Sequence, residues 1–247
     1  MLSTARPPFD NPIAREAAAS ALDYEQINEI IAEGIPEIAN GIFAPESPGF
    51  VEDTGAATYD PERAAELVQQ YEDETGQSLQ FELATTPSPE LTRLVELQRE
   101  MYEAAGMNVS TVQVDQSTLI QRAIDGDYQA QTWRQYPGMD PDNLYVWFYG
   151  EGNPVNFMRF DDPVVNDLLD RGREEPDPQE RIRIYEELNR RLTEQHYHLW
   201  ASWTIWAIPS GSDVHGIVGA RPVGTDGSQD YTGLALGHDP ALMWREQ

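Results

Sequence analysis

Residues 78 to 133 switch between two hydrophobic periods, and this switch limits the fold more than any other feature of the sequence. The segments 79–84, 107–114 and 128–135 show the short apolar alternation of β-strands. Between them, "SPELTRLVELQREMYEAAG" and "QSTLIQRAIDGD" follow the period of an amphipathic helix. Strands that alternate with helices predict an α/β layer with crossover connections and a largely parallel sheet.

A fourth strand is expected far along the chain. The segment "HLWASWTIWAIP" is rich in aromatic and branched residues and has the composition of a buried strand. We therefore expect a mixed sheet flanked by helices, with strands near residues 79–84, 109–114, 129–134 and 199–208.

Further helices have recognisable ends. An Ala-rich helix is expected from Pro12, a second begins after Asp23 as its N-cap, and a third runs from Asp60 to Gly76. The stretches "DPVVNDLLDRGRE" and "DPQERIRIYEELNRRLTEQ" predict two more helices late in the chain. Residues 35–60 are rich in Pro and Gly and predict a long surface loop.

The charge balance excludes several classes of partner. The formal net charge of the 247 residues is −27, and all 16 basic residues are arginines. Such a field repels nucleic acid and anionic membranes, so neither is an expected partner. The absence of cysteine excludes disulfides, thiolate metal sites and a cysteine nucleophile. Codon bias and adaptation to salt both explain the excess of acid and the lack of lysine.

No targeting segment is expected within the chain. The opening "MLSTARPPFD" lacks the basic and apolar regions of a signal peptide. The longest uncharged run, residues 195–212, is interrupted by histidines, a proline and a glycine, and predicts a buried strand rather than a membrane span.

One aromatic stretch follows the third predicted strand. The sequence "TWRQYPGMDPDNLYVWFYGEG" places six aromatic residues and one arginine beside two prolines and three glycines. Ligands of open α/β sheets bind beyond the carboxyl ends of the strands, which is where this stretch begins.

Four segments, in order along the chain, resemble a known family. They are "PPFDNPIAREAAASALD", "YDPERAAELV", "GDYQAQTWRQ" with "DPDN", and "DDPVVNDLLDRGREEPDPQERIRIYEELNRRLTEQHYHLWASW". Together they are similar to the extracytoplasmic solute-binding proteins of the oligopeptide, dipeptide and nickel ABC importers. The family's members are two-lobed and much longer than this chain.

The resemblance implies an organisation and a function. Residues 1–225 would form the C-terminal ligand-binding lobe, and residues 226–247 a return segment that packs on an N-terminal lobe. The protein would capture a peptide-like, oligosaccharide-like or anionic solute outside the cytoplasm by lobe closure. It would deliver that solute to the ABC permease subunits, with no enzymatic activity and no cofactor.

The same resemblance points to the ligand-binding residues Trp133, Arg134, Gln135 and Tyr136. Trp133 offers a stacking surface, Arg134 a fork of donors for a carboxylate, and Gln135 and Tyr136 an amide and a phenol. The alternative is that Trp133 belongs to the core and Arg134 binds a local carbonyl.

The chain departs from the peptide-binding members at one position. They carry an aspartate three residues after the tryptophan, where this chain has Tyr136. Asp140 and Asp142 could replace that anion, but "DPDN" favours a helix-capping role for them. A ligand with a carboxylate or many hydroxyls therefore fits better than a peptide amino terminus.

Other functions remain as alternatives. Glu194, His196 and His198 lie at a period of two and could ligate a metal, although no metal site is predicted. The many carboxylates allow a glycosidase, but they follow the spacing of solvated helix faces. A folded lobe that binds nothing is the third possibility.

Overall fold

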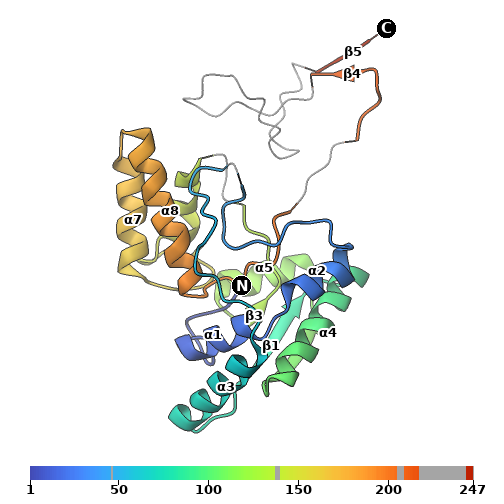
Figure 1. Ribbon diagram of the computed structural model, residues 1–247, viewed down its shortest axis with the longest axis vertical. Coiled ribbons are helices and arrows are strands. Elements are labelled where there is room, and N and C mark those ends of the chain that lie inside the picture. The colour runs from blue at the N-terminus through green and yellow to red at the C-terminus, as the bar shows by residue number, and fades with distance from the viewer. Residues whose placement is uncertain (46, 137–139, 205–208, 217–242, 247) are drawn as a thin grey trace. The chain divides into compact units, whose positions relative to one another are not determined.

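The computed structural model describes residues 1–247 except 46, 137–139, 205–208, 217–242 and 247 (Figure 1). It separates into two compact units, Met1–Trp203 and Thr204–Gln247. Among the described residues, no helix is both long and apolar enough to cross a membrane.

A three-stranded parallel sheet organises the first unit. Strand β1 (Gln80–Thr85) lies between β2 (Asn108–Gln113) and β3 (Ala130–Gln131). Phe81 pairs with Val109, and Leu83 pairs with Ala130. The helices α4 (Pro89–Ala104) and α5 (Gln116–Asp125) connect the strands. The predicted alternation of strands and helices along residues 78–133 is confirmed.

The remaining helices agree closely with the sequence signals. Asp23 caps α2 and Asp60 caps α3, each accepting a backbone N–H at 2.9 Å. Gly76 ends α3 with a φ of +69°, a conformation that favours glycine. These helices are α1 (Pro12–Ser20), α2 (Tyr24–Ala32), α3 (Pro61–Thr75), η1 (Pro141–Asn143), α6 (Leu144–Phe148), α7 (Pro163–Glu174) and α8 (Pro178–Glu194).

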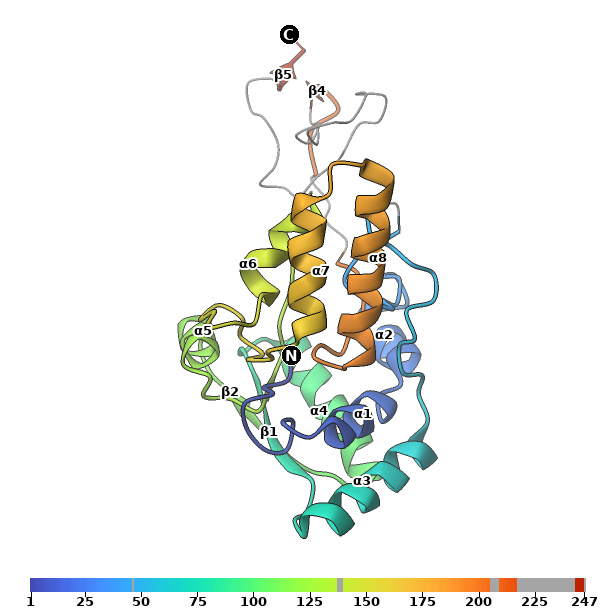
Figure 2. The same ribbon diagram turned by 90° about the vertical axis from the view of Figure 1, so that its left-hand side faces the viewer.

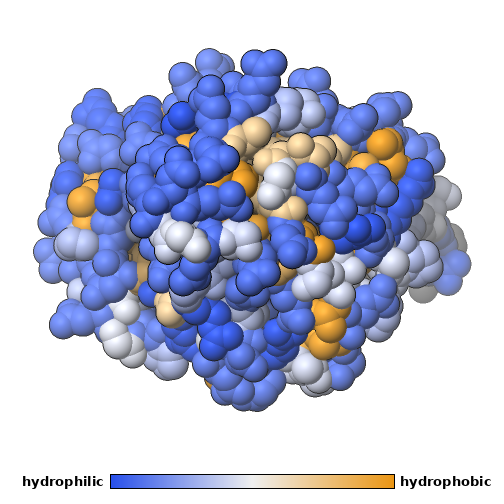
Figure 3. Space-filling view, turned by 90° about the horizontal axis from the view of Figure 1, so that it is seen from below, coloured by the Kyte–Doolittle hydropathy of each residue, from blue (hydrophilic) through white to orange (hydrophobic). Residues whose placement is uncertain are grey.

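The first unit contains two hydrophobic clusters. The sheet cluster joins the strands to α1, α3 and α4, and Phe81 packs edge-on against both Phe9 and Tyr102 at 4.9 and 5.2 Å. The aromatic cluster lies around α6, α7 and α8, where α7 and α8 run side by side (Figure 2). The face shown in Figure 3 is mostly hydrophilic, with apolar residues gathered near its centre.

The expected fourth strand is wrong for the residues described. Residues 199–204 do not join the sheet; Ser202 instead forms an isolated antiparallel bridge with Ile38. The start of the chain pairs with the outer edge of β3: Gln131 N–H donates to the Met1 carbonyl, and Ser3 N–H donates to the Gln129 carbonyl. Residues 205–208 lie outside the described part. The sheet is parallel throughout its three strands, with one antiparallel bridge from Leu2 to Ala130.

The second unit contains a short antiparallel pair. Strand β4 (Val214–His215) pairs with β5 (Trp244–Arg245), and the rings of His215 and Trp244 stack at 4.3 Å. The predicted boundary between residues 225 and 226 lies outside the described residues.

Candidate functional site

The carboxyl ends of the parallel strands share one edge of the sheet. There the hydroxyls of Thr85 and Thr132 lie 2.9 Å apart, and Thr132 N–H donates to the Ala84 carbonyl at 2.9 Å. These bonds fix the direction in which the chain leaves β3. Trp133 is the next residue, so the predicted site begins where clefts of α/β sheets open.

The four predicted residues follow each other beyond this edge. Trp133 and Gln135 are half-buried, whereas Arg134 and Tyr136 are exposed. Within the described part of the chain, the Arg134 guanidinium forms no ion pair. Tyr136 is 41% exposed, and its side chain interacts with another group of the protein. The segment therefore presents a cation and a phenol to solvent.

Trp133 divides its surface between core and solvent. Its ring meets Phe157 edge-on, with centroids 5.3 Å apart, and it packs against the aromatic cluster. The ring of Trp147 also packs on Phe157, with the two centroids 6.0 Å apart. Packing thus fixes the orientation of Trp133, and only its remaining surface is available for stacking on a ligand.

Asp140 and Asp142 are both engaged by arginines. Asp140 accepts two hydrogen bonds from Arg181, at 2.6 and 3.0 Å, and caps η1 through Asp142 N–H. Asp142 accepts two from Arg173, at 2.9 and 3.1 Å. The hydrogen bond from Arg181 lowers the pKa of Asp140. The expected capping role holds for Asp140, and neither carboxylate is an unpaired anion.

No sequence pattern pointed to these two arginines. Arg173 lies on α7 and Arg181 on α8, 31 and 41 residues from their partners. Both helices also carry arginines that pair within one helical turn, such as Arg171 with Asp167 and Arg183 with Glu180, although Arg171 also lies 4.0 Å from Glu187 of α8. The positions of these arginines in the sequence do not distinguish those that reach Asp140 and Asp142 from the others on the same helices.

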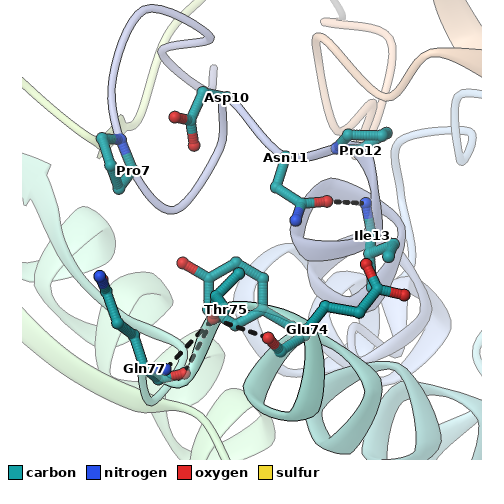
Figure 4. Close-up of a pocket in the computed structure, with 9 residues that line it drawn as sticks. Pro7, Asp10, Asn11, Pro12, Ile13, Glu74, Thr75 and Gln77 are labelled. Atoms are coloured by element: carbon teal, nitrogen blue, oxygen red, sulfur yellow. Dashed lines mark hydrogen bonds between the residues drawn. The ribbon is translucent and has the colours of Figure 1, made fainter.

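Two cavities in the first unit lie apart from residues 133–136. One, of about 550 Å³, is lined by Asp10, Asn11, Tyr71, Thr75 and neighbouring residues (Figure 4). The other, of about 570 Å³, lies between the α1–α2 junction, the loop around Thr54 and the end of α8. Neither contains a residue of the predicted site.

Two histidines, His196 and His198, follow α8. Both line the larger cavity, and burial lowers the pKa of each, strongly for His198. The His198 ring stacks on Trp200 at 4.6 Å. Among the residues with described positions, no group of three His, Cys, Asp or Glu is arranged to hold a metal.

Comparison with known proteins decides the family. The sequence profile of the bacterial extracellular solute-binding proteins, family 5 Middle, matches residues 1–156. The chain belongs to this family. The resemblance seen in the sequence is therefore confirmed.

Individual relatives agree with this assignment. The chain is 27% identical to a probable di/tripeptide-binding protein 5 of Pseudomonas aeruginosa, covering 95% of this chain and 45% of that protein. It is 26% identical to the heme-binding protein A of Haemophilus influenzae, covering 75% of this chain and 35% of that protein. The chain thus spans less than half the length of these relatives.

A solved structure shares the fold. The ABC transporter-associated periplasmic binding protein DppA from Helicobacter pylori, in complex with the peptide STSA, superposes with a TM-score of 0.81 at 19% identity. The match covers all of this chain and 46% of that protein. The α/β expectation is confirmed as a periplasmic-binding-protein-like fragment with a parallel sheet.

Proposed function

We propose that this chain is part of the substrate-binding component of an ABC importer. The observation that carries the proposal is the family profile over residues 1–156. The protein acts by binding a solute and passing it to the permease subunits in the membrane, without a catalytic step and without a cofactor. Its place of action is outside the cytoplasm, in line with the extracellular family to which it belongs.

The chain supplies one lobe of a two-lobed protein. Residues 1–225 form the C-terminal lobe, and residues 226–247 form the segment that returns to the other lobe. The chain covers 45% and 46% of the length of two relatives, which supports its being one of two lobes. Solute capture follows by closure of the two lobes around the ligand.

Trp133, Arg134, Gln135 and Tyr136 form the wall of the ligand cleft on this lobe. Their place beyond the carboxyl edge of the sheet supports the assignment. The exposed guanidinium of Arg134 binds an anionic group of the ligand, and the open surface of Trp133 stacks on an apolar or planar part.

The ligand is a small solute with a carboxylate, and a short peptide bound through its carboxyl end is the first candidate. Relatives are described as di/tripeptide-binding and heme-binding proteins, and the related DppA holds a peptide. Asp140 and Asp142, the two carboxylates that follow the wall in sequence, are both engaged by arginines, so neither is left unpaired for an amino-terminal ammonium.

Titration calorimetry with a panel of di- and tripeptides tests the proposal. In the complete two-lobed protein, we expect Arg134→Ala to weaken binding by on the order of 2–4 kcal/mol through the loss of a charge-assisted bond. Trp133→Ala should cost on the order of 1–3 kcal/mol. Arg93→Ala, which removes an exposed arginine of α4, is the control and should bind as wild type does.

Three outcomes would redirect the assignment. If both site variants stay folded and bind as tightly as wild type, the cleft wall lies elsewhere on the lobe. If the complete two-lobed protein binds no member of the panel, the interpretation as a non-binding lobe gains support. Turnover of a glycoside by the wild-type chain would instead favour the hydrolase alternative.

A further inference from the structure

The larger of the two cavities is lined by residues whose buried polar atoms lack partners. Among the described residues, nine buried side-chain nitrogen or oxygen atoms have no hydrogen-bond partner, and five of them belong to residues that line this cavity. None belongs to a residue that lines the smaller cavity of Figure 4. The five are Tyr24 Oη, Asn40 Oδ1, Thr193 Oγ1, His198 Nε2 and Trp200 Nε1. Buried polar groups are normally hydrogen-bonded, so their gathering at one cavity indicates a place that receives a polar guest.

Three parts of the chain enclose this cavity. They are the start of α2, the loop between α2 and α3, and the end of α8 with the residues that follow it. Thr193 is 3% exposed and His198 is 7% exposed, so bulk solvent does not satisfy either side chain. An unpaired polar group in such surroundings carries the full cost of its desolvation, and a guest that pairs with it recovers that cost.

Two of the five groups are held in place by contacts of their own. The Asn40 amide nitrogen donates to the carbonyls of Val51 and Glu52, at 3.0 and 2.6 Å, which leaves the amide oxygen as the unpaired atom. The rings of His198 and Trp200 stack with their centroids 4.6 Å apart. Groups that are already oriented lose little conformational freedom when a ligand binds.

The polar atoms around the cavity are uncharged, and together they donate and accept. Burial lowers the pKa of His198 well below its usual range and raises the pKa of Tyr24, so both side chains are neutral at neutral pH. The Trp200 indole N–H only donates, the Asn40 amide oxygen only accepts, and the hydroxyls of Tyr24 and Thr193 do both. A matching guest therefore carries several groups that donate and accept at once, as hydroxyls do.

The charged residues around the cavity are acidic. Its lining includes Asp23, Glu25, Glu52 and Asp53, and among the residues with described positions it includes no arginine. None of the four carboxylates forms an ion pair in the described part of the chain. Carboxylates accept hydrogen bonds from hydroxyls and repel an anionic ligand. The volume of about 570 Å³ lies in the range of small-molecule sites.

We propose that this cavity is a second ligand site, which takes a neutral polyhydroxylated molecule about as large as a monosaccharide. The hydroxyls of the guest pair with the five unpartnered atoms, and the half-buried ring of Trp200 packs against its less polar face. Because the five atoms are covered, small rotations of their side chains accompany binding. The site is independent of the proposed wall, since none of residues 133–136 lines the cavity.

Nuclear magnetic resonance of the complete two-lobed protein provides the test. The indole N–H signal of Trp200 is identified by its loss in Trp200→Phe, and its shift is followed during titration with glucose, galactose and their uronates. The uronates match the sugars in size and add one negative charge. We expect glucose or galactose to shift the signal in a saturable way, and the uronate of that sugar to bind at least about tenfold more weakly.

Two variants remove single polar atoms while they keep most of the side-chain shape. Tyr24→Phe and Thr193→Val should each weaken sugar binding by about fivefold to tenfold through the loss of one hydrogen bond. In the absence of sugar, their melting temperatures should be unchanged or raised, because each variant removes a buried hydroxyl that has no partner in the described structure. Tyr71→Phe, which removes a phenol from the smaller cavity, is the control and should bind the sugar as wild type does.

Three results would overturn the proposal. The first is that neither sugar shifts the Trp200 signal, or that a uronate binds as tightly as its sugar. The second is that Trp133→Ala abolishes sugar binding while Tyr24→Phe and Thr193→Val leave it unchanged, because the sugar then occupies the wall. The third is a large loss of melting temperature in both of those variants without sugar, which would show that the two hydroxyls have partners within the protein. The peptide titrations at residues 133–136 are scored separately, so either proposal can fail without the other.

Discussion

The two hydrophobic clusters of the first unit are built on different principles. The sheet cluster consists of aliphatic side chains, alanines and a few rings, drawn from residues 2–130 and packed between the strands and their helices. The aromatic cluster draws on residues 1, 42–43 and 123–197 and contains many rings. Buried polar groups accompany it: Asp162 is 3% exposed, and Asn189 is fully buried. The first cluster is built mainly from apolar side chains, whereas the second combines rings with buried polar groups.

Arg15 connects the two regions. It is 5% exposed, and it donates to the Phe9 carbonyl at 2.9 Å and to the Gln195 carbonyl at 2.8 Å. Phe9 belongs to the sheet cluster, and Gln195 follows α8 beside the aromatic cluster. The guanidinium thus donates to two carbonyls that are 186 residues apart in sequence and that only the folded structure brings together.

The largest expected effect comes from the buried polar contacts of the aromatic cluster. Arg191 binds Asp162 at 2.7 Å, and Tyr197 donates to the same carboxylate at 3.2 Å. Arg191→Met would leave the Asp162 carboxylate buried without its cation, and it should lower the free energy of unfolding by about 3–5 kcal/mol. Urea unfolding measures the loss. Arg183→Met, at an exposed ion pair of the same helix, should cost less than about 1 kcal/mol; equal losses would remove the distinction between the two pairs.

Two glutamines of the sheet region sharpen the comparison. Gln129 accepts from Glu82 N–H at 2.8 Å and donates to the Pro7 carbonyl at 2.9 Å, so Gln129→Met should cost about 1–3 kcal/mol. The Gln131 side chain is 1% exposed, and its amide has no partner among the described residues. Gln131→Met should be neutral or stabilising, by up to about 1 kcal/mol. Thermal and urea unfolding of both variants test this, and a large loss at Gln131 would show that its amide has a partner in solution.

Salt acts on the surfaces of both regions at once. The chain has forty-three acidic and only sixteen basic residues, so its negative charges repel one another, and salt weakens this repulsion by screening. We expect the melting temperature to rise by roughly a few degrees as sodium chloride increases toward the molar range. Potassium glutamate serves as a second salt to control for specific anion effects. A melting temperature that is unchanged or lowered in both salts would contradict the prediction.

The smallest effect is expected at Asp140, the N-cap of η1, which pairs with Arg181. The hydrogen bond from Arg181 lowers the pKa of Asp140 in the folded protein. A carboxyl with a lowered folded pKa stabilises the protein above its unfolded pKa of roughly 3.9, and this contribution is lost as the pH falls through the folded pKa. Asp140→Asn, which keeps a capping side chain, should therefore cost less than about 1 kcal/mol at pH 7 and nothing at the lowest pH. Melts of both proteins from pH 7 to pH 2 measure the difference, and a constant difference would contradict the linkage.

Local chemistry made most of the sheet region predictable. The caps at Asp23 and Asp60, the stop at Gly76 and the strands around Phe81 and Val109 follow from side chains within a few residues of one another. The strand prediction is wrong for residues 199–204, because their composition suits a strand whereas the place beside β3 is taken by residues 1–3. Composition predicts that a segment can pair, and it does not say which edge is free.

The sequence by itself determined the alternation of strands and helices, the family and the position of residues 133–136 after a strand end. Only the tertiary structure decided that Trp133 shares its surface with Phe157, and that Asp140 and Asp142 are held by Arg181 and Arg173. The physical reason is that periodicity and capping act over one or two turns of chain, whereas an ion pair depends on where two distant helices place their side chains. On a protein with so many acids, the partners of Arg173 and Arg181 are a property of the fold.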